Sequence, residues 1–307
     1  MTTTRLRDSI FECLADAKSD SDDVKQKALK TLVSITKVSP QNRNLLAQTD
    51  EALPTLLSSL ESSSPLLQTL TLSILFNLSL NPNLKQSLTD TETIYCLNSF
   101  ITSPVSPESS KIAASLICSL AMLDKNKAKF GVANTIQCLV KAVSGSRSLA
   151  AHHLLSSLTE LVQFHGNCSV AVRAGAVPVL IKLVEESRAD GEDLAGTSLA
   201  ILSLLARFNE GLSALRKTDE IVNIMLEVLK GRCMLSKEGA AEVLIRLFEE
   251  SEGCVRDALR LEFSSVLADL SVRGSARARE RAGLLLKKMM EADLDTYMEE
   301  SPMYYHW

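Results

Sequence analysis

Histidine and cysteine side chains are the groups in this 307-residue chain best suited to metal binding or nucleophilic catalysis. The four histidines are His152, His153, His165 and His306, and Cys168 lies close to His165 in the sequence. Because imidazole and thiolate groups bind zinc, His153, His165 and Cys168 could contribute to a metal site. No fourth ligand lies at a suitable spacing, and no His-Glu-x-x-His motif occurs. We therefore interpret these residues as ordinary members of helix surfaces and loops, and expect no metal.

Motifs of nucleotide-binding enzymes and of serine hydrolases are absent from the sequence. It contains no Gly-x-Gly-x-x-Gly, no P-loop and no Gly-x-Ser-x-Gly, and the polar stretch 144–148 lacks the lysine of a phosphate-binding loop. The seven cysteines are widely spaced and form no Cys-x-x-Cys pair: Cys13, Cys96, Cys118, Cys138, Cys168, Cys233 and Cys254. This pattern is typical of buried free thiols in a reducing compartment, which favours the cytoplasm or the nucleus. We expect no catalytic residue and no cofactor.

The composition is that of a folded protein, with 46% hydrophobic and 23% charged residues. The net charge of −4 argues against a protein devoted to nucleic acid. The N-terminal residues lack the apolar core of a signal peptide. The charge-free stretch 66–80 has 15 residues and is shorter than the ~20 that a membrane span needs. At 307 residues, the chain must either divide into domains or extend as a repeat array.

Two sequence patterns recur along the chain with steps of 41 to 44 residues. In an eight-residue pattern the fifth position is Leu or Ile and the eighth is Ile, Leu or Met; its copies begin at Ala28, Thr71, Ala113, Leu154, Ser198, Ala240 and Ala282. In a nine-residue pattern positions two, five and nine are apolar; its copies begin at Ala52, Thr93, Thr135, Ala176, Glu220 and Glu262. Both spacings place the apolar residues on one face of a helix.

A shared period of about 42 residues predicts a solenoid, because a unit of this size must stack on its neighbours to bury its apolar face. Each unit contains a short helix, a second helix and a longer third helix. Asn81-Pro82 marks the end of a third helix, and Gly175 permits a sharp turn between first and second helices. Pro54 and Pro178 fall in the first turns of second helices, where proline is tolerated. We therefore predict an all-α, right-handed α-solenoid of about six to seven units.

The segments LFNLSLNPNLKQSL (75–88) and CSVAVRAGAVPVLIKLVEE (168–186) resemble armadillo repeats. The segment GSARARERAGLLLKKM (274–289) resembles the end of the armadillo array in plant U-box proteins. The resemblance implies an N-terminal cap at 1–23, a solenoid at 24–290 and an acidic, aromatic tail at 291–307. Such ligases carry a U-box of about 70 residues ahead of the repeats. Nothing in residues 1–23 resembles one, so we expect the ligase part to be absent.

The armadillo resemblance also implies a partner-binding groove lined by third helices, at the third and seventh positions of each eight-residue pattern. These pairs are Lys30/Ser34, Ser73/Asn77, Ser115/Ser119, Ser156/Glu160, Ala200/Leu204, Glu242/Arg246 and Leu284/Lys288. Importin-alpha-like proteins repeat Trp and Asn at these positions, and only Asn77 fits that pattern. A nuclear-import adaptor is therefore not expected, and neither is the long basic groove of beta-catenin.

Three further segments have both a functional and a plain structural interpretation. A basic run could bind an acidic partner or nucleic acid, or could be the solvated face of a capping helix; it comprises Arg273, Arg277, Arg279, Arg281, Lys287 and Lys288. Ser103 and Ser106 precede prolines and are either kinase sites or parts of a linker. The final segment SPMYYHW (301–307) is either an interface anchor or a cover for the last repeat.

The sequence favours a non-catalytic scaffold that binds a protein or peptide in the groove, with a ubiquitin-linked or signalling role implied by the resemblance. The alternative is a component of ubiquitin ligation. Nucleic acid is not the expected ligand, no membrane span is expected, and a monomer is favoured.

Overall fold

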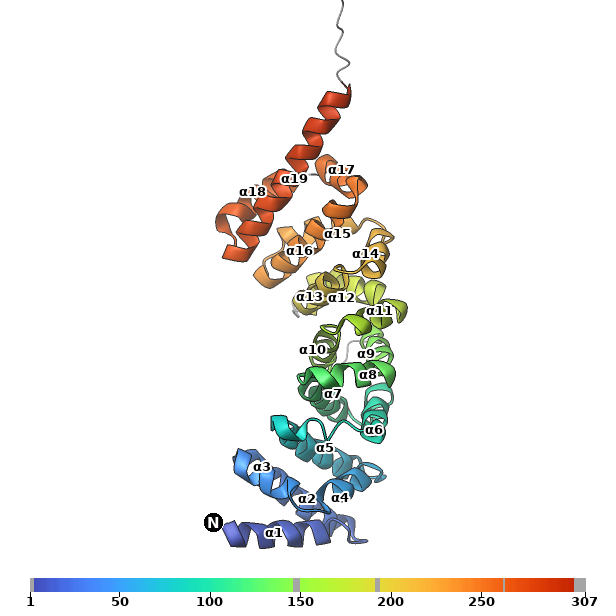
Figure 1. The fold of residues 1–307 in the computed structure, drawn as a ribbon, viewed down its shortest axis with the longest axis vertical. Helices are drawn as coiled ribbons and strands as arrows, with labels where there is room; N and C mark the ends of the chain where they lie inside the picture. The colour runs from blue at the N-terminus through green and yellow to red at the C-terminus, as the bar shows by residue number, and fades with distance from the viewer. Residues whose placement is uncertain (1–2, 146–149, 191–193, 262, 301–307) are drawn as a thin grey trace, which may run out of the picture. The chain divides into compact units, whose positions relative to one another are not determined.

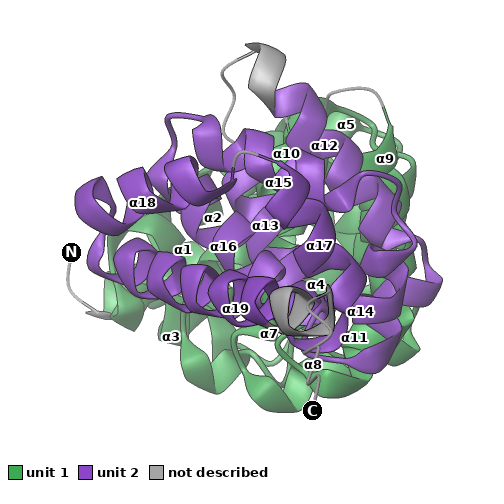
Figure 2. Ribbon diagram, turned by 90° about the horizontal axis from the view of Figure 1, so that it is seen from above, with its two compact units in different colours: residues 1–170 green, residues 171–307 purple. Residues whose placement is uncertain are grey.

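The computed structural model describes residues 3–145, 150–190, 194–261 and 263–300. Within these residues it contains nineteen α-helices, one 3-10 helix and no strand. Backbone contacts divide the chain into two compact units, unit 1 at 1–170 and unit 2 at 171–307 (Figures 1 and 2). Each unit is a stack of helices, so the predicted all-α armadillo solenoid fold is confirmed.

The helices follow the predicted three-helix order, after an N-terminal helix α1 (Thr3–Asp16). The first helices are α3 (Pro40–Ala47), η1 (Pro82–Leu84), α8 (Asp124–Val132), α11 (His165–Arg173), α14 (Asn209–Arg216) and α17 (Glu252–Arg260). The second helices are α4 (Ala52–Leu60), α6 (Thr91–Thr102), α9 (Thr135–Ser144), α12 (Ala176–Asp190), α15 (Ile221–Lys230) and α18 (Phe263–Arg273). The third helices are α2 (Asp22–Val38), α5 (Pro65–Ser79), α7 (Pro107–Ala121), α10 (Ala151–Leu161), α13 (Leu194–Leu205), α16 (Met234–Glu250) and α19 (Ala276–Glu300).

The core of each unit lies between third helices and the shorter helices that cover them. In unit 1, α5 packs against α2 and α7, and α7 packs against α10; in unit 2, α16 packs against α13 and α19 (Figure 1). The fifth position of the eight-residue pattern is fully buried in α5 and α13, as Leu75 and Leu202. Burial of such a side chain stabilises the fold by about 1.5–3 kcal/mol. The apolar positions found in the sequence are therefore the contacts between repeats.

The turns use the residues that the sequence indicated. Asn81 caps η1, its side chain accepting a hydrogen bond from the Asn83 N–H at 3.0 Å. Gly175 adopts a φ of 81° between α11 and α12. The turns before α9 and α15 make the same left-handed step with non-glycine residues, Asn134 at 62° and Glu220 at 53°. Glycine is therefore only one of several residues that this turn accepts.

An asparagine in the first helices, which the sequence analysis did not single out, joins successive repeats at two places. Asn recurs at 42, 83, 126 and 167, with Gly at 211 and 253, and Asn126 and Asn167 make the joining bonds. The buried amide of Asn126 donates to the Leu120 carbonyl at 3.0 Å and to the Lys85 carbonyl at 3.1 Å. The Asn167 amide donates to the corresponding carbonyls of Leu161 and Lys127, both at 2.9 Å. These bonds satisfy carbonyls in the first-helix segment and at the end of the third helix of the preceding repeat.

At Gly211 the chain closes differently. A Cβ atom at Gly211 would lie 2.2 Å from the Leu205 carbonyl oxygen, the atom that corresponds to the Asn126 and Asn167 acceptors. The backbone itself takes the space of the amide there, so a side chain is excluded.

The C-terminal boundary predicted at residue 290 falls inside a helix, because α19 continues to Glu300. The aromatic segment 301–307 lies outside the described residues. In the part of the chain that the structure describes, no single helix is long and apolar enough to cross a membrane, although the bent pair His165–Arg173 and Ala176–Ser187 would pass by length and composition together.

The Asn126 bonds predict that a buried and an exposed asparagine of the first-helix segments contribute differently to stability. Asn126→Ala leaves the Lys85 and Leu120 carbonyls without their amide donor and should lower the free energy of unfolding by about 2–3 kcal/mol. Asn83→Ala, in the first-helix segment of the preceding repeat, changes an exposed side chain and should alter the free energy of unfolding by less than about 0.5 kcal/mol. Urea denaturation monitored by circular dichroism measures both; equal effects would refute the structural role of the Asn126 amide.

Candidate protein-binding surface

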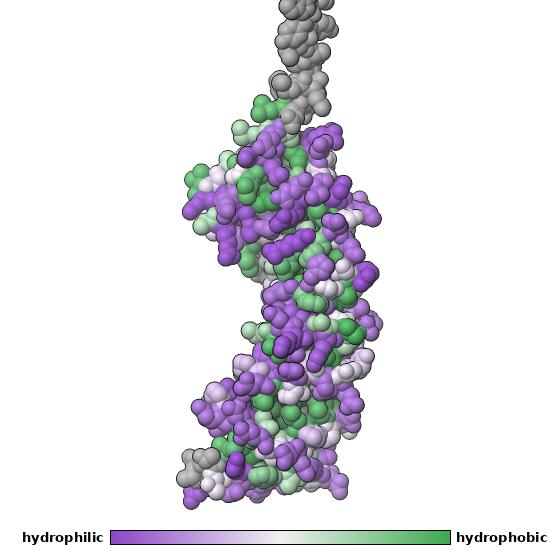
Figure 3. All heavy atoms as spheres, in the orientation of Figure 1, coloured by the Kyte–Doolittle hydropathy of each residue, from purple (hydrophilic) through white to green (hydrophobic). Residues whose placement is uncertain are grey.

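The predicted groove residues lie on the third helices, and the structure distinguishes the two positions of each pair in unit 1. At the third position, Ser73 and Ser115 are half-buried, and Lys30 and Ser156 are exposed. These side chains therefore reach solvent on α2, α5, α7 and α10. In Figure 3, hydrophilic atoms cover most of the visible face of each unit.

At the seventh position, three of the four side chains in unit 1 are engaged between helices. Asn77 is 6% exposed and donates to the Thr36 hydroxyl on α2 at 3.0 Å. Ser119 is 7% exposed and receives a 2.8 Å hydrogen bond from the Ser79 hydroxyl on α5. Glu160 forms an ion pair with Lys127 at 2.9 Å. Ser34, on α2, is exposed. The seventh positions thus form a polar seam that holds neighbouring helices together.

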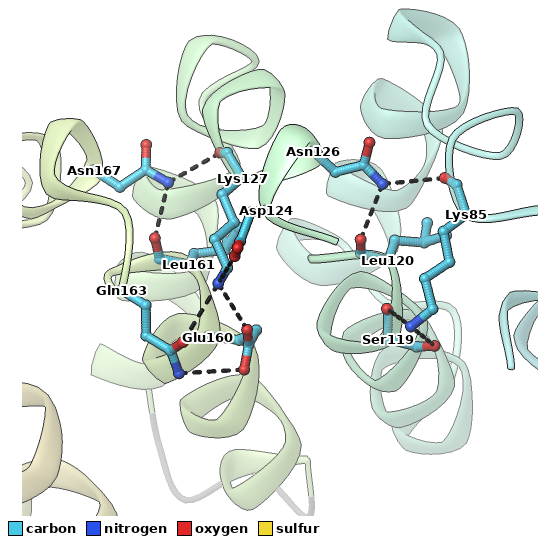
Figure 4. Close-up of polar contacts among 10 residues, drawn as sticks. All are labelled: Lys85, Ser119, Leu120, Asp124, Asn126, Lys127, Glu160, Leu161, Gln163 and Asn167. Atoms are coloured by element: carbon cyan, nitrogen blue, oxygen red, sulfur yellow. Dashed lines mark hydrogen bonds and ion pairs between the residues drawn. The ribbon is translucent and has the colours of Figure 1, made fainter. Parts of the chain in front are cut away.

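Two lysines of the first-helix segments, Lys85 and Lys127, reach this seam from equivalent places (Figure 4). The backbone carbonyl of each accepts the amide hydrogen bond from the Asn of the next repeat, Asn126 or Asn167. Each ammonium group then extends to the end of the third helix of its own repeat, Lys85 toward Ser119 and Lys127 toward Glu160. Negative partial charge at the C-terminus of a helix favours a cation at both places.

The two ammonium groups have different partners. Lys127 pairs with Asp124 at 2.7 Å and with Glu160 at 2.9 Å, and it donates to the Gln163 side chain at 3.3 Å. Burial by itself lowers the pKa of Lys127, but the hydrogen bonds to Asp124 and Glu160 outweigh burial and the net pKa is raised. Lys127 is therefore a fully paired buried cation.

Lys85 donates to the Ser119 carbonyl and lies 3.4 Å from the Ser119 hydroxyl. Within the described residues no carboxylate lies within ion-pair distance of its ammonium group. Burial lowers the pKa of Lys85, and the more distant charges of Cys118 and Glu160 oppose that effect without reversing it. Among the described residues, the direct contacts of this buried ammonium group are therefore neutral oxygen atoms.

A hydroxyl–imidazole contact joins the exposed third positions of α7 and α10. The Ser115 hydroxyl and the His153 Nδ1 are 2.9 Å apart, and the Ser115 hydroxyl also bonds the Lys111 carbonyl at 2.8 Å. Burial lowers the pKa of His153, the charges of Lys111 and His152 lower it further, and Glu108 opposes them. A neutral imidazole is therefore favoured on this surface.

Because folding lowers the pKa of His153, the unfolded chain binds more protons in the window between the folded value and the ordinary value of about 6.5. The free energy of unfolding should therefore fall as the pH drops through that window. His153→Gln, which keeps a hydrogen-bonding side chain, should flatten this dependence. Urea denaturation between pH 7.5 and pH 5 measures it, with the exposed His165→Gln as the control; an unchanged slope in His153→Gln would contradict the prediction.

Unit 2 carries a different surface at the predicted positions. Ala200 and Leu204 of α13 are half-buried. Glu242 of α16 pairs with Arg281 of α19 at 2.9 Å, and Arg246 pairs with Glu249 at 3.0 Å. The charged pair predicted for the groove is therefore held by internal ion pairs.

The basic run near the C-terminus is largely engaged within unit 2. Arg273 pairs with Asp269, Lys287 with Glu291, and Arg281 with Glu242. Arg279 donates to the Gly274 carbonyl at the end of α18. Four of the six side chains thus have partners within unit 2, as the capping interpretation of the run expects.

The remaining candidates are Ser103, Ser106, the cysteines and the histidines. The Ser106 side chain accepts from the Ser109 N–H at 3.0 Å and caps α7, whereas Ser103 is exposed at the end of α6. None of the seven cysteines forms a disulfide. Among the described residues, no group of three or more potential ligands could hold a metal ion, and His153, His165 and Cys168 form no such group.

Sequence reasoning did not identify Lys85, Lys127 or the recurring Asn as members of the seam. The signal was present, since Asn recurs at 42, 83, 126 and 167 with nearly the period of the apolar patterns. The role of these residues is fixed by partners about 40 residues away, as for Asn126 and Lys85.

Comparisons with known proteins give consistent results. A family model described as the plant U-box protein ARM repeat region matches residues 9–298. U-box domain-containing protein 8 of Arabidopsis thaliana is 28% identical over 215 residues, covering 70% of this chain and 55% of that protein. U-box domain-containing protein 1 of Medicago truncatula is 30% identical over 118 residues, covering 38% and 17%. The chain thus spans about half the length of the first relative and less of the second.

A likeness to a solved structure concerns the fold alone. The crystal structure of an engineered protein matches with a TM-score of 0.78 and 16% identity, covering 94% of this chain and 71% of that one.

Proposed function

This chain belongs to the plant U-box protein ARM repeat family, and from that premise we propose that it is a non-catalytic scaffold that binds a protein segment across the third helices of unit 1. The observation that carries the proposal is the row of accessible third positions on α2, α5, α7 and α10. Lys30, Ser73, Ser115 and Ser156 are exposed or half-buried, although the residues beside them in the same helices are closely packed.

The chemistry of this row suits an extended or helical protein segment. Small hydroxyl side chains leave room for a partner's backbone and supply hydrogen bonds to it. Exposed apolar side chains adjoin the row at the ends of α5 and α7, where Leu80 is 48% and Met122 is 65% exposed. A polar row beside separate apolar side chains is the composition of a protein interface.

Large charged side chains at the third positions of α7 and α10 should weaken binding of the partner segment without affecting the fold. We expect the double change Ser115→Arg with Ser156→Arg to lower the affinity for peptides selected on the full chain by 10-fold or more, about 1.4 kcal/mol. The matched control is Ser58→Arg with Ser99→Arg, at exposed positions of α4 and α6. Calorimetry gives the affinities and circular dichroism verifies folding; unchanged binding by the first variant would exclude this face as the site.

A part in ubiquitin ligation is a second candidate, favoured by the names of the relatives, both of which are called U-box domain-containing proteins. The repeats would then present a substrate or contact another component of the reaction. Incubation of the purified chain with ubiquitin, activating enzyme and conjugating enzyme tests a ligase activity of the chain itself. We expect no chain formation above the level without the protein, and robust chain formation would favour direct ligation.

A further inference from the structure

Lys85 and Lys127 have the same backbone position in successive repeats, but the charged groups next to their ammonium groups differ. The Lys127 ammonium group has the carboxylates of Asp124 and Glu160 within 2.9 Å. Among the described residues, the structure places only Ser119 in hydrogen-bonding contact with the Lys85 ammonium group, through its carbonyl and hydroxyl oxygens. The Lys127 site therefore shows how a carboxylate is held at this place in the repeat, and the Lys85 site lacks one.

Each carboxylate or amide at the Lys127 site is replaced at the Lys85 site by a side chain without that group. Glu160 corresponds to Ser119, the seventh residue of the same eight-residue pattern. Asp124, three residues before Lys127, corresponds to Pro82, three residues before Lys85. Gln163 corresponds to Met122, each lying three residues after the seventh position. Ser119 is shorter than Glu160 and carries no carboxylate. It therefore supplies no acidic group to Lys85, whereas Glu160 supplies one to Lys127.

The Lys85 side chain is poorly placed to be compensated by water. The residue is 8% exposed, so its charge is largely removed from solvent. A buried ammonium group without a counter-ion is unfavourable, and the usual remedy in proteins is a paired carboxylate. The titratable groups that act on it are the Cys118 thiol and Glu160, and Glu160 is already paired with Lys127.

Lys85 lies near the ends of α5 and α7, where a protein segment would have to reach it. The Ser119 hydroxyl next to it bonds the Ser79 hydroxyl at 2.8 Å, and both serines are buried. The exposed side chains of Leu80 and Met122 follow directly at the ends of α5 and α7. A desolvated charge pair beside contacts that exclude water can contribute strongly to binding.

We propose that Lys85 binds the side-chain carboxylate of an Asp or Glu in an extended partner segment that crosses α5 and α7, with apolar residues of the segment on Leu80 and Met122. The proposal rests on the proposed function, since it specifies the partner class of the same surface. A carboxylate is chosen over a phosphate because the equivalent Lys127 site is filled by carboxylates with one negative charge each.

The probe is a library of randomised 12-residue peptides, selected on the full chain and then measured individually by calorimetry. We expect the selected peptides to share an Asp or Glu at one aligned position, next to apolar residues. Replacing that residue by its amide should weaken binding about 30-fold, because a buried ammonium group is left without its partner. A phosphoserine at the same position should bind no better than the carboxylate; tighter binding of phosphoserine would overturn the choice of ligand.

Two variants of the protein test Lys85 in independent ways. Ser119→Glu supplies an internal carboxylate, as Glu160 does in the next repeat, so it should raise the melting temperature and lower peptide affinity about 30-fold. Lys85→Met removes the charge and should lower affinity to a similar degree. The controls are Ser87→Glu and Lys125→Met, exposed positions that make the same changes of charge nearby and should leave affinity within about 2-fold.

Failure of this inference differs from failure of the proposed function. If peptides lose binding to the Ser115→Arg, Ser156→Arg variant but bind Lys85→Met normally, the groove is the site and Lys85 is not its anchor. If peptides bind the double arginine variant normally, the proposed surface itself is wrong. Selected peptides without a shared acidic position would also overturn the inference.

Discussion

The third helices of this chain are stable only because they pack on one another. Each carries apolar side chains at fixed positions, such as Leu75 and Leu202, that no single helix triplet could cover. In unit 1 the contact runs from α2 through α5 and α7 to α10, and in unit 2 from α13 through α16 to α19. Because the contact uses one face of every third helix, another face is left to solvent in each repeat, and the candidate surface follows from that requirement.

Packing of the third helices against one another buries polar groups between them. The hydrogen bonds of the seam satisfy these groups. Asn126 and Asn167 each satisfy two carbonyls of the preceding repeat. Where Gly211 replaces Asn, the backbone itself approaches the Leu205 carbonyl. The seam fixes how one repeat sits on the next, since a buried amide has few alternative partners. It also removes Asn77 and Ser119 from the set of freely accessible groove residues.

Charge is distributed within the seam unevenly, and that unevenness is the most specific feature of the candidate surface. Lys127 is neutralised by Asp124 and Glu160, and Arg281 by Glu242. Lys85 alone of the two equivalent lysines lacks such a partner, while the hydroxyls of Ser79 and Ser119 and the exposed Leu80 and Met122 lie beside it. A repeat array discriminates partners through such local differences, because its backbone shape recurs from unit to unit.

The sequence by itself determined the helical fold, the three-helix repeat and the apolar positions that are buried, because these follow from local periodicity and turn chemistry, as at Asn81-Pro82 and Gly175. It also indicated that Arg279 and Arg281 could serve a capping helix. It did not separate the third positions, which stay accessible, from Asn77 and Ser119, which are buried between helices. Only the tertiary structure decided that, because the partners of a seam residue come from another repeat: Thr36 for Asn77, Ser79 for Ser119 and Lys85 for Asn126. Local patterns give the face on which a residue lies, and its partner across the interface depends on the packing of whole helices.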